Sequence, residues 1–246
     1  MRLKDKEISN LIKEHGIFHE KYIESNCIVS FNDPDGSYSM CLSEFIKRDK
    51  AIIYPDREEF FKTIAHKKQN LINKKVLEIG VADGNNALRI YKYLNPSKIF
   101  LIDPWVRQKK RAADRGASDA VHKKAYQKTK SKFSDKNCEI IKNYAENVVD
   151  NFEDEFFDFI YIDGDHSYEG CKKDLDLYYP KLKKGGFFGG HDFTGNLNSF
   201  VNKKYGVQKA VCEFLISHNK KLQFITLCHE TKAPDKILPF DWGFVK

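Results

Sequence analysis

Residues 75–84 read KVLEIGVADG, an apolar run that ends in glycine and precedes a stretch with helical spacing. Similar apolar runs lie at 98–103 (KIFLID), 138–144 (CEIIKNY), 157–165 (FDFIYIDGD) and 186–192 (GFFGGHD). Runs of this kind alternating with helices indicate strands buried on both faces of a mostly parallel sheet. Two further strands are expected near 222–227 and 242–245, and they should form an antiparallel hairpin because no helix separates them. The pattern predicts a Rossmann-like α/β fold with a seven-stranded, mostly parallel sheet, an antiparallel last strand and helices on both faces.

The first 70 residues lack this alternation of strands and helices. We therefore expect them to form a separate N-terminal segment, called the leader below. The spacing of apolar residues at 8–12 favours a helix, and FNDPDGSYS at 31–39 is typical of a turn. Asp56 is placed to cap a helix through REEFFKTIAHKK, whose early glutamates suit its positive end. We therefore predict a helical and loop leader at 1–70, which caps the sheet or contacts a second copy in a homo-oligomer, and a main domain at 71–246.

The composition excludes several classes of protein. In the 246 residues, 41% are hydrophobic and 31% are charged, which is a globular balance. The charged N-terminus has no apolar core of a signal peptide, and no apolar run approaches the roughly 18 residues needed to span a membrane. The six cysteines are scattered without a CxxC pair, which argues against a zinc or redox motif. A soluble, cytoplasmic protein is expected.

The positive charge of the chain is concentrated in one segment. Residues 107–136 hold eleven Lys or Arg against three Asp, a net charge of +8, while the whole chain carries +7. One interpretation is a solvated helical face, and another is a surface that attracts an anionic substrate or nucleic acid. Nucleic acid is the weaker expectation, because few aromatic residues are present there to stack on bases.

Carboxylates and glycines follow the first two predicted strands. In open α/β sheets ligands bind outside the carboxyl ends of the strands, so these positions are candidates for a site. Gly80 and Gly84 allow a tight turn and a close approach to a ligand, although Gly80 alone fits an ordinary strand-to-helix turn. The stretch is not GxGxxG, and Glu78 and Asp83 would repel a pyrophosphate. A cofactor with an ammonium and a sulfonium fits better, with Asp103 placed to accept hydrogen bonds from ribose hydroxyls.

These motifs together resemble a known family. VLEIGVADG, FLIDPW, FDFIYIDGDHSYEG and KKGGFFGGHDF are similar to the class I S-adenosylmethionine-dependent methyltransferases, over about residues 70–246. Within that class the chain looks most like the metal-dependent sugar O-methyltransferases of the macrocin O-methyltransferase type. The resemblance implies S-adenosylmethionine as cofactor. The residues that it implies contact the cofactor are Glu78, Gly80, Gly84, Asp103, Tyr144, Ala145 and Asp163. Of these, Asp103 would hold the ribose, and Tyr144 and Ala145 would flank the adenine.

The acceptor side is expected at the next two strand ends. Asp163, His191 and Asp192 can converge on one divalent cation, which the resemblance implies is magnesium, although an imidazole ligand also admits manganese, iron or zinc. His166, three residues after Asp163, is placed where related enzymes have their base. Asp165 is a second candidate catalytic residue, as another base or as a group that orients His166.

We therefore expect O-methylation of a hydroxyl on a small acceptor, a sugar or glycoconjugate precursor, with metal assistance. The basic segment would favour an anionic or nucleotide-linked sugar. Three alternatives stay open at this point: a nucleic-acid or protein methyltransferase that uses residues 107–136, an enzyme similar to the cephalosporin hydroxylase group, and a scaffold that binds the cofactor without turnover.

Overall fold

The computed structural model of the chain describes residues 28–33, 36–41, 49–54, 56–65, 71–106, 118–193, 206–229 and 237–246. Its strands are β1 (Ile28–Asp33), β2 (Gly36–Cys41), β3 (Ile52–Tyr54), β4 (Lys75–Ile79), β5 (Lys98–Ile102), β6 (Cys138–Ile141), β7 (Phe157–Ile162), β8 (Leu182–Gly190), β9 (Phe224–His229) and β10 (Ile237–Val245). Its helices are α4 (Arg57–Thr63), α5 (Asn85–Leu94), α6 (Asp119–Lys132), α7 (Tyr168–Tyr178) and α8 (Val207–Ser217), with short 3-10 turns η2 (Ala145–Asn147) and η3 (Val149–Asn151).

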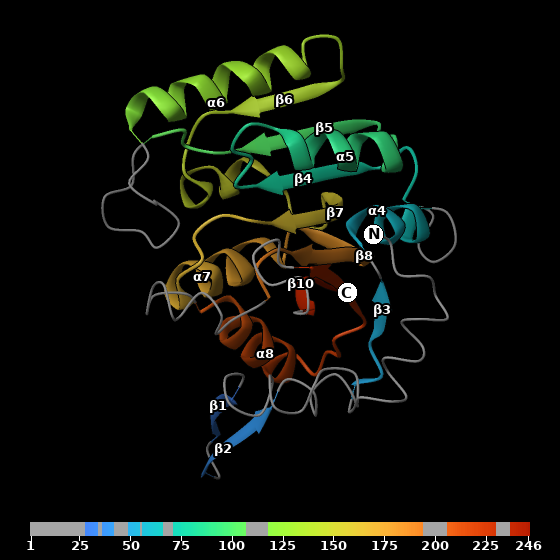
Figure 1. Cartoon of the computed structure of the whole chain (residues 1–246), viewed down its shortest axis with the longest axis vertical. Coiled ribbons are helices and arrows are strands. Elements are labelled where there is room, and N and C mark those ends of the chain that lie inside the picture. The colour runs from blue at the N-terminus through green and yellow to red at the C-terminus, as the bar shows by residue number, and fades with distance from the viewer. Residues whose placement is uncertain are drawn as a thin grey trace.

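One large sheet runs through the centre of the molecule, in the order β3-β9-β10-β8-β7-β4-β5-β6 (Figure 1). Strands β6, β5, β4, β7 and β8 run parallel to one another, and β10 is antiparallel to both β8 and β9. The predicted fold is confirmed, including the hairpin of the last two strands. An eighth strand was not predicted: β3, only three residues long, comes from the leader and pairs in parallel with β9.

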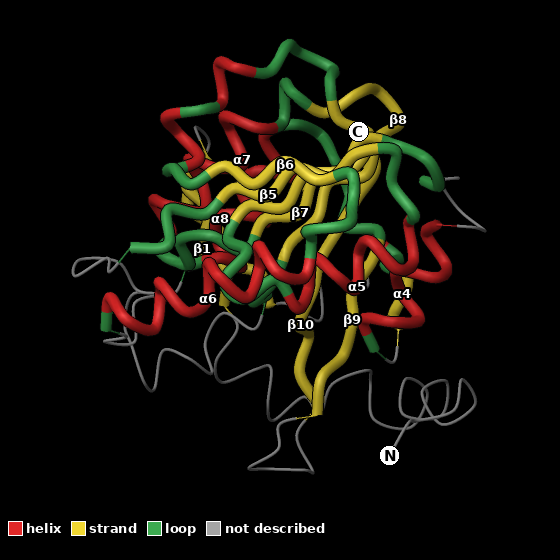
Figure 2. Tube along the Cα trace, turned by 90° about the horizontal axis from the view of Figure 1, so that it is seen from above, coloured by secondary structure: helices red, strands yellow, loops and turns green. Residues whose placement is uncertain are grey.

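Helices cover both faces of this sheet, as Figure 2 shows from above. Alternate residues of β4 point to opposite faces, so Leu77 and Ile79 join one hydrophobic cluster and Val76 joins the other. The first cluster includes residues of α7 and α8, and the second includes residues of α4, α5 and the end of α6. The leader helix α4 therefore packs on the same face of the sheet as α5.

Side chains cap the first turns of two helices, and the cap of α4 was predicted. The Asp56 side chain accepts a hydrogen bond from the Glu59 backbone N–H at 2.9 Å and caps α4. The Ser167 hydroxyl accepts from the Gly170 N–H at 3.0 Å and caps α7. The stretch 31–39, predicted as a turn or loop, instead lies mostly in strands, since residues 31–33 belong to β1 and 36–39 to its antiparallel partner β2. The helix predicted at 8–12 lies outside the described residues.

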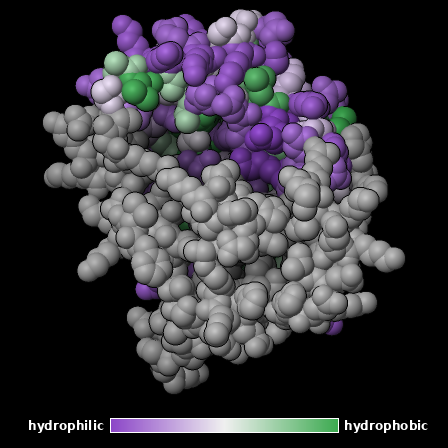
Figure 3. All heavy atoms as spheres, viewed as in Figure 1, coloured by the Kyte–Doolittle hydropathy of each residue, from purple (hydrophilic) through white to green (hydrophobic). Residues whose placement is uncertain are grey.

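The described part of the basic segment forms helix α6 and the loop after it. Thr129 is the one buried residue of α6, so the helix presents most of its lysines to solvent. Figure 3 shows hydrophilic side chains gathered over the end of the molecule where α6 lies. None of the helices in the described ranges is long and apolar enough to cross a membrane.

Candidate active site

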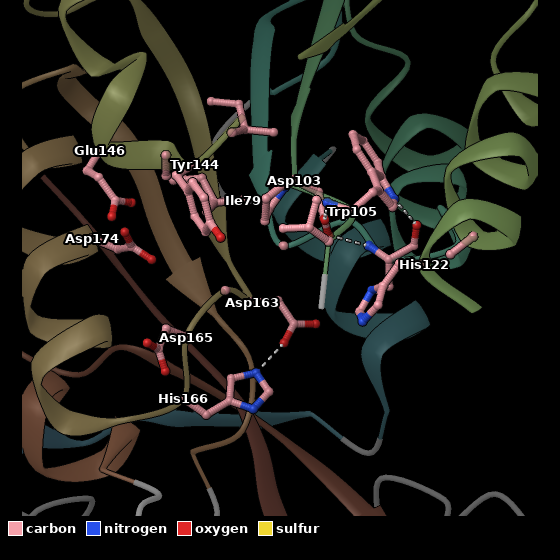
Figure 4. A pocket seen from close by; sticks show the side chains of 18 of the residues that line it. Ile79, Asp103, Trp105, His122, Tyr144, Glu146, Asp163, Asp165, His166 and Asp174 are labelled. Carbon is pink, nitrogen blue, oxygen red and sulfur yellow. Dashed lines mark hydrogen bonds and ion pairs between the residues drawn. The ribbon is translucent and has the colours of Figure 1, made fainter. Parts of the chain in front are cut away.

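A cavity of about 330 Å³ opens at the carboxyl ends of the parallel strands (Figure 4). Residues that directly follow β4, β5 and β7 line it, among them Gly80, Asp103 and Asp163. Tyr144 and Ala145 contribute from the segment after β6. The cavity therefore lies at the edge of the sheet where ligands of open α/β folds bind.

Gly80 brings the loops after β4 and β7 into direct contact. Its φ of +84° lies in the left-handed region, and a Cβ at this position would lie 1.9 Å from the backbone oxygen of Asp163. The Asp163 N–H also donates to the Ile79 carbonyl at 2.7 Å. A side chain cannot be accommodated here, so the close approach of the two loops requires glycine.

Asp103 lies in the loop after β5 and joins this loop to the loop after β4. One carboxylate oxygen accepts from the Ala82 N–H at 2.9 Å and the other accepts from the Trp105 N–H at 2.6 Å. The Trp105 indole donates in turn to the Ala82 carbonyl at 2.7 Å. Burial raises the pKa of Asp103, and the backbone hydrogen bonds oppose part of that rise. Because a carboxylate has about four lone-pair sites, Asp103 can still accept hydrogen bonds from a ligand in the cavity.

Glu78 is fully buried at the end of β4. Its Oε1 accepts from the Asn86 side-chain nitrogen at 2.9 Å, and its Oε2 has no hydrogen-bond donor among the described residues. Burial raises the pKa of Glu78 to about 8, a rise to which the charges of Asp163 and Asp103 contribute. Neither Glu78 nor Gly84 is among the described residues that line the cavity. Glu78 Oε2 can therefore accept a hydrogen bond, and the negative charges of Asp163 and Asp103 nearby favour a donor that carries a positive charge.

Two carboxylates and an imidazole meet beside the cavity, and Asp163 and His166 of this group also line it. Ligand atoms of Asp163, His166 and Asp192 all lie within 4.8 Å of one another. His166 lies between the two acids, with Nε2 3.1 Å from Asp163 Oδ1 and Nδ1 3.1 Å from Asp192 Oδ2. Burial opposes a charge on His166, but the nearby carboxylates outweigh it and raise the pKa of the ring. This donor set can hold a divalent cation or a proton.

Asp165 lines the same cavity but is directed toward helix α7. Its Oδ1 accepts a hydrogen bond from the Ser167 backbone N–H at 3.0 Å. In Figure 4 its carboxylate lies beside His166. The structure therefore places Asp165 where its charge acts on His166.

His191 lies outside the three-residue cluster, although the sequence predicted it as a metal ligand. Its Nδ1 is 2.8 Å from Asp241 Oδ1, and its ring contacts the Arg57 guanidinium. Its Nε2 is 3.5 Å from Asp192 Oδ1. A neighbouring guanidinium charge disfavours a second cation at this ring, so Asp163 and Asp192, on either side of His166, are the better candidate metal ligands.

Residues 77–193 match the sequence profile of a family described as a methyltransferase domain. This part, a little less than half of the chain, is similar to that methyltransferase domain. This match bears out the predicted enzyme class, a methyltransferase, for these residues. No curated protein matches the chain by sequence.

Solved structures share the architecture of the methyltransferase domain at low sequence identity. The O-methyltransferase from Bacillus cereus in complex with SAH is 15% identical, with a TM-score of 0.52 over 83% of this chain and 90% of that one. TomG, an O-methyltransferase from Streptomyces achromogenes involved in tomaymycin synthesis, is 11% identical, with a TM-score of 0.51 over 92% and 95%. Spermidine synthase from Thermotoga maritima is 21% identical over 89% of this chain and 68% of that one, with a lower TM-score of 0.49. These likenesses show the fold, and the narrower resemblance to macrocin-type enzymes stays a prediction.

A buried ionic network next to the candidate site was not predicted. Asp241, in β10, is fully buried and receives hydrogen bonds from Arg57, from the Tyr161 hydroxyl and from Thr226 Oγ1 at 2.6 Å. Burial alone would raise the pKa of Asp241, but the charge of Arg57 and the bond with His191 hold it well below the usual range. The signal available in the sequence was an acid within the otherwise apolar terminal strand, PFDWGFV.

Proposed function

We propose that this chain transfers a methyl group from S-adenosylmethionine to a hydroxyl of a small acceptor, a sugar or glycoconjugate precursor, with the help of a divalent cation. The observation that carries the proposal is the cluster of Asp163, His166 and Asp192 beside a cavity of about 330 Å³ at the strand ends. Methyl transfer from a sulfonium requires alignment more than covalent help, and a pre-shaped cavity supplies alignment.

The donor would bind along the ends of β4, β5 and β6. In this proposal the buried Glu78 receives the ammonium of the cofactor, and the tight turns at Gly80 and Gly84 bring the backbone close to its amino-acid end. Asp103 accepts from the ribose hydroxyls. Tyr144 and Ala145, which line the same cavity, flank the adenine.

The described residues fit a divalent cation. Asp163 and Asp192 supply carboxylate oxygens, the ligands that magnesium and manganese prefer, and the imidazole of His166 lies between them. When bound, such an ion lowers the pKa of a coordinated hydroxyl and so makes it a better nucleophile. We propose Asp163 and Asp192 as its ligands and leave His191 in the Arg57 network.

His166 would take the proton of the acceptor hydroxyl. It lies at the cavity with its ring held by two carboxylates, which fixes its orientation toward an incoming acceptor. Against the effect of burial, Asp163, Asp192 and, with a smaller effect, Asp165 raise the pKa of His166, so the charge of Asp165 would help to support the protonated ring. A histidine held in this way is a suitable general base once a cation neutralises part of the surrounding negative charge.

The charge of the cavity favours a neutral hydroxyl compound as acceptor. Five carboxylates line it, against the two imidazoles of His122 and His166: Asp103, Glu146, Asp163, Asp165 and Asp174. An anionic acceptor, as the basic segment suggested, would need the divalent cation to offset these charges. The lysines of α6 are largely exposed rather than directed into the cavity, so they do not change this balance.

The test is a methylation assay on a panel of sugars and other hydroxyl compounds, with S-adenosylmethionine as donor and with and without magnesium or manganese. His166→Ala should lower kcat by about 10²–10⁴, while the matched control His218→Ala, an exposed histidine after α8, should keep full activity. Asp163→Asn and Asp192→Asn should remove the metal response. Full activity of the His166 variant would exclude it as the base, and activity unchanged by a chelator would exclude the metal.

A further inference from the structure

Arg57, the first residue of the leader helix α4, reaches into the methyltransferase domain. Its Nε lies 3.0 and 3.1 Å from the two oxygens of Asp241, and its Nη2 donates to Asp241 Oδ1 at 2.7 Å. Its Nη1 donates to Asn86 Oδ1 at 3.0 Å. The Arg57 side chain is 16% exposed and that of Asp241 is fully buried. One guanidinium therefore joins the leader, the terminal strand β10 and the start of α5.

The contact with Arg57 determines which way the Asn86 carboxamide faces. A guanidinium only donates hydrogen bonds, so Asn86 must present its oxygen to Arg57. Arg89 Nη1 also approaches this oxygen, at 3.5 Å. The amide nitrogen then points away from Arg57, where it donates to Glu78 Oε1 at 2.9 Å. The orientation of the Glu78 carboxylate thus depends on a residue outside the methyltransferase domain.

We propose that Arg57 is a positioning residue for the methyl donor: through Asn86 it holds Glu78 so that the free Oε2 meets the ammonium of the cofactor. This inference rests on the proposed role of Glu78. It assigns a function to the leader, because the amino-acid end of the donor would be bound correctly only when α4 is docked. The charge of Arg57 acts in the same direction, since it opposes the rise of the Glu78 pKa that burial causes.

Binding of two ligands can show whether Arg57 positions Glu78 or only contributes to packing. S-adenosylhomocysteine carries the amino-acid end, whereas 5′-methylthioadenosine lacks it and retains the adenosine. By isothermal titration on the full chain, Arg57→Lys should weaken S-adenosylhomocysteine about tenfold and leave methylthioadenosine nearly unchanged. Lysine keeps the charge but has no planar fork to contact Asp241 and Asn86 together. Asn86→Ala should give the same ligand-selective loss.

A double-mutant cycle tests whether Arg57 acts through Asn86. The variant with Arg57→Lys and Asn86→Ala should bind S-adenosylhomocysteine about as weakly as the weaker single variant, near tenfold, rather than the hundredfold expected for independent effects. The matched control is Thr226→Val, which removes the 2.6 Å hydrogen bond to Asp241 but leaves the Asn86 branch intact. It should lower thermal stability without changing either affinity.

The outcomes distinguish this inference from the function on which it rests. Equal losses for both ligands, or losses that multiply in the double variant, would overturn the positioning role of Arg57. Glu78→Gln tests the proposed role of Glu78 independently of Arg57. If it binds S-adenosylhomocysteine as wild type does, the proposed role of Glu78 is wrong; if it binds weakly while Arg57→Lys binds normally, only the inference about Arg57 fails.

Discussion

Replacing Glu78 by glutamine should make the ligand-free protein relatively more stable as the pH rises. The ordinary pKa of a glutamate, 4.5, is raised to about 8 at this buried position. The folded state therefore holds a proton that the unfolded state has released, and stability falls as pH rises from 4.5 until it levels off above 8. With about 1.36 kcal/mol per pKa unit, the ionised carboxylate costs the fold roughly 5 kcal/mol, of which about 2 kcal/mol develops between pH 6 and pH 8.

Glutamine has nearly the same shape and can accept the hydrogen bond from Asn86, but it does not ionise. Its buried NH₂ carries its own cost, and that cost does not change with pH. The informative quantity is therefore the difference in free energy of unfolding between variant and wild type, measured by urea denaturation at pH 6 and at pH 8. This difference should shift by about 2 kcal/mol in favour of the variant.

The matched control is Glu153→Gln at an exposed position, for which the difference should be the same at both pH values. A constant difference for Glu78→Gln would refute the claim that the protein holds a strained, proton-binding carboxyl at the end of β4.

Three further substitutions test the packing around the site. Gly80→Ala should cost several kcal/mol or prevent folding, because its Cβ would lie 1.9 Å from the Asp163 oxygen; the control Gly185→Ala, at φ +76° with nothing within 4 Å, should cost only about 1 kcal/mol in a thermal melt. Asp241→Asn should destabilise the protein by about 3–5 kcal/mol in denaturant titrations, since it leaves the buried Arg57 without its carboxylate. Breaking the exposed pair Lys98–Glu139 should cost less than about 1 kcal/mol, and similar losses for the two pairs would contradict the difference in their burial. Asp56→Ala should cost about 1 kcal/mol through loss of the α4 cap, and an unchanged melting temperature would show that this cap contributes nothing.

The central sheet could be predicted from the sequence because its strands are apolar runs that end at recognisable residues. Parallel strands place those ends at one edge, so Asp103 and Asp163 were expected near one cavity, and both line it. The three-residue strand β3 could not be predicted, since a run this short has no periodicity.

The sequence predicted both His191 and Asp192 as metal ligands, because adjacent positions do not show that only one of the two side chains joins the cluster with Asp163 and His166. Asp192 adopts a φ of +56°, and its carboxylate lies in the cluster with His166, while His191 contacts Asp241. A left-handed aspartate is uncommon enough that no local pattern indicates it. The partnership of Arg57 and Asp241 spans 184 positions and depends on the docking of α4, so only the folded chain reveals it.

The short strand β3 also has a consequence for how the protein behaves at high concentration. It pairs with the first three of the six residues of β9, a strand that would otherwise end the sheet. A long unpaired edge is a template on which another chain can add a strand, and a three-residue edge offers very little of one. A shortened chain that begins after residue 70 would expose β9, and we expect it to aggregate even where its own core remains folded.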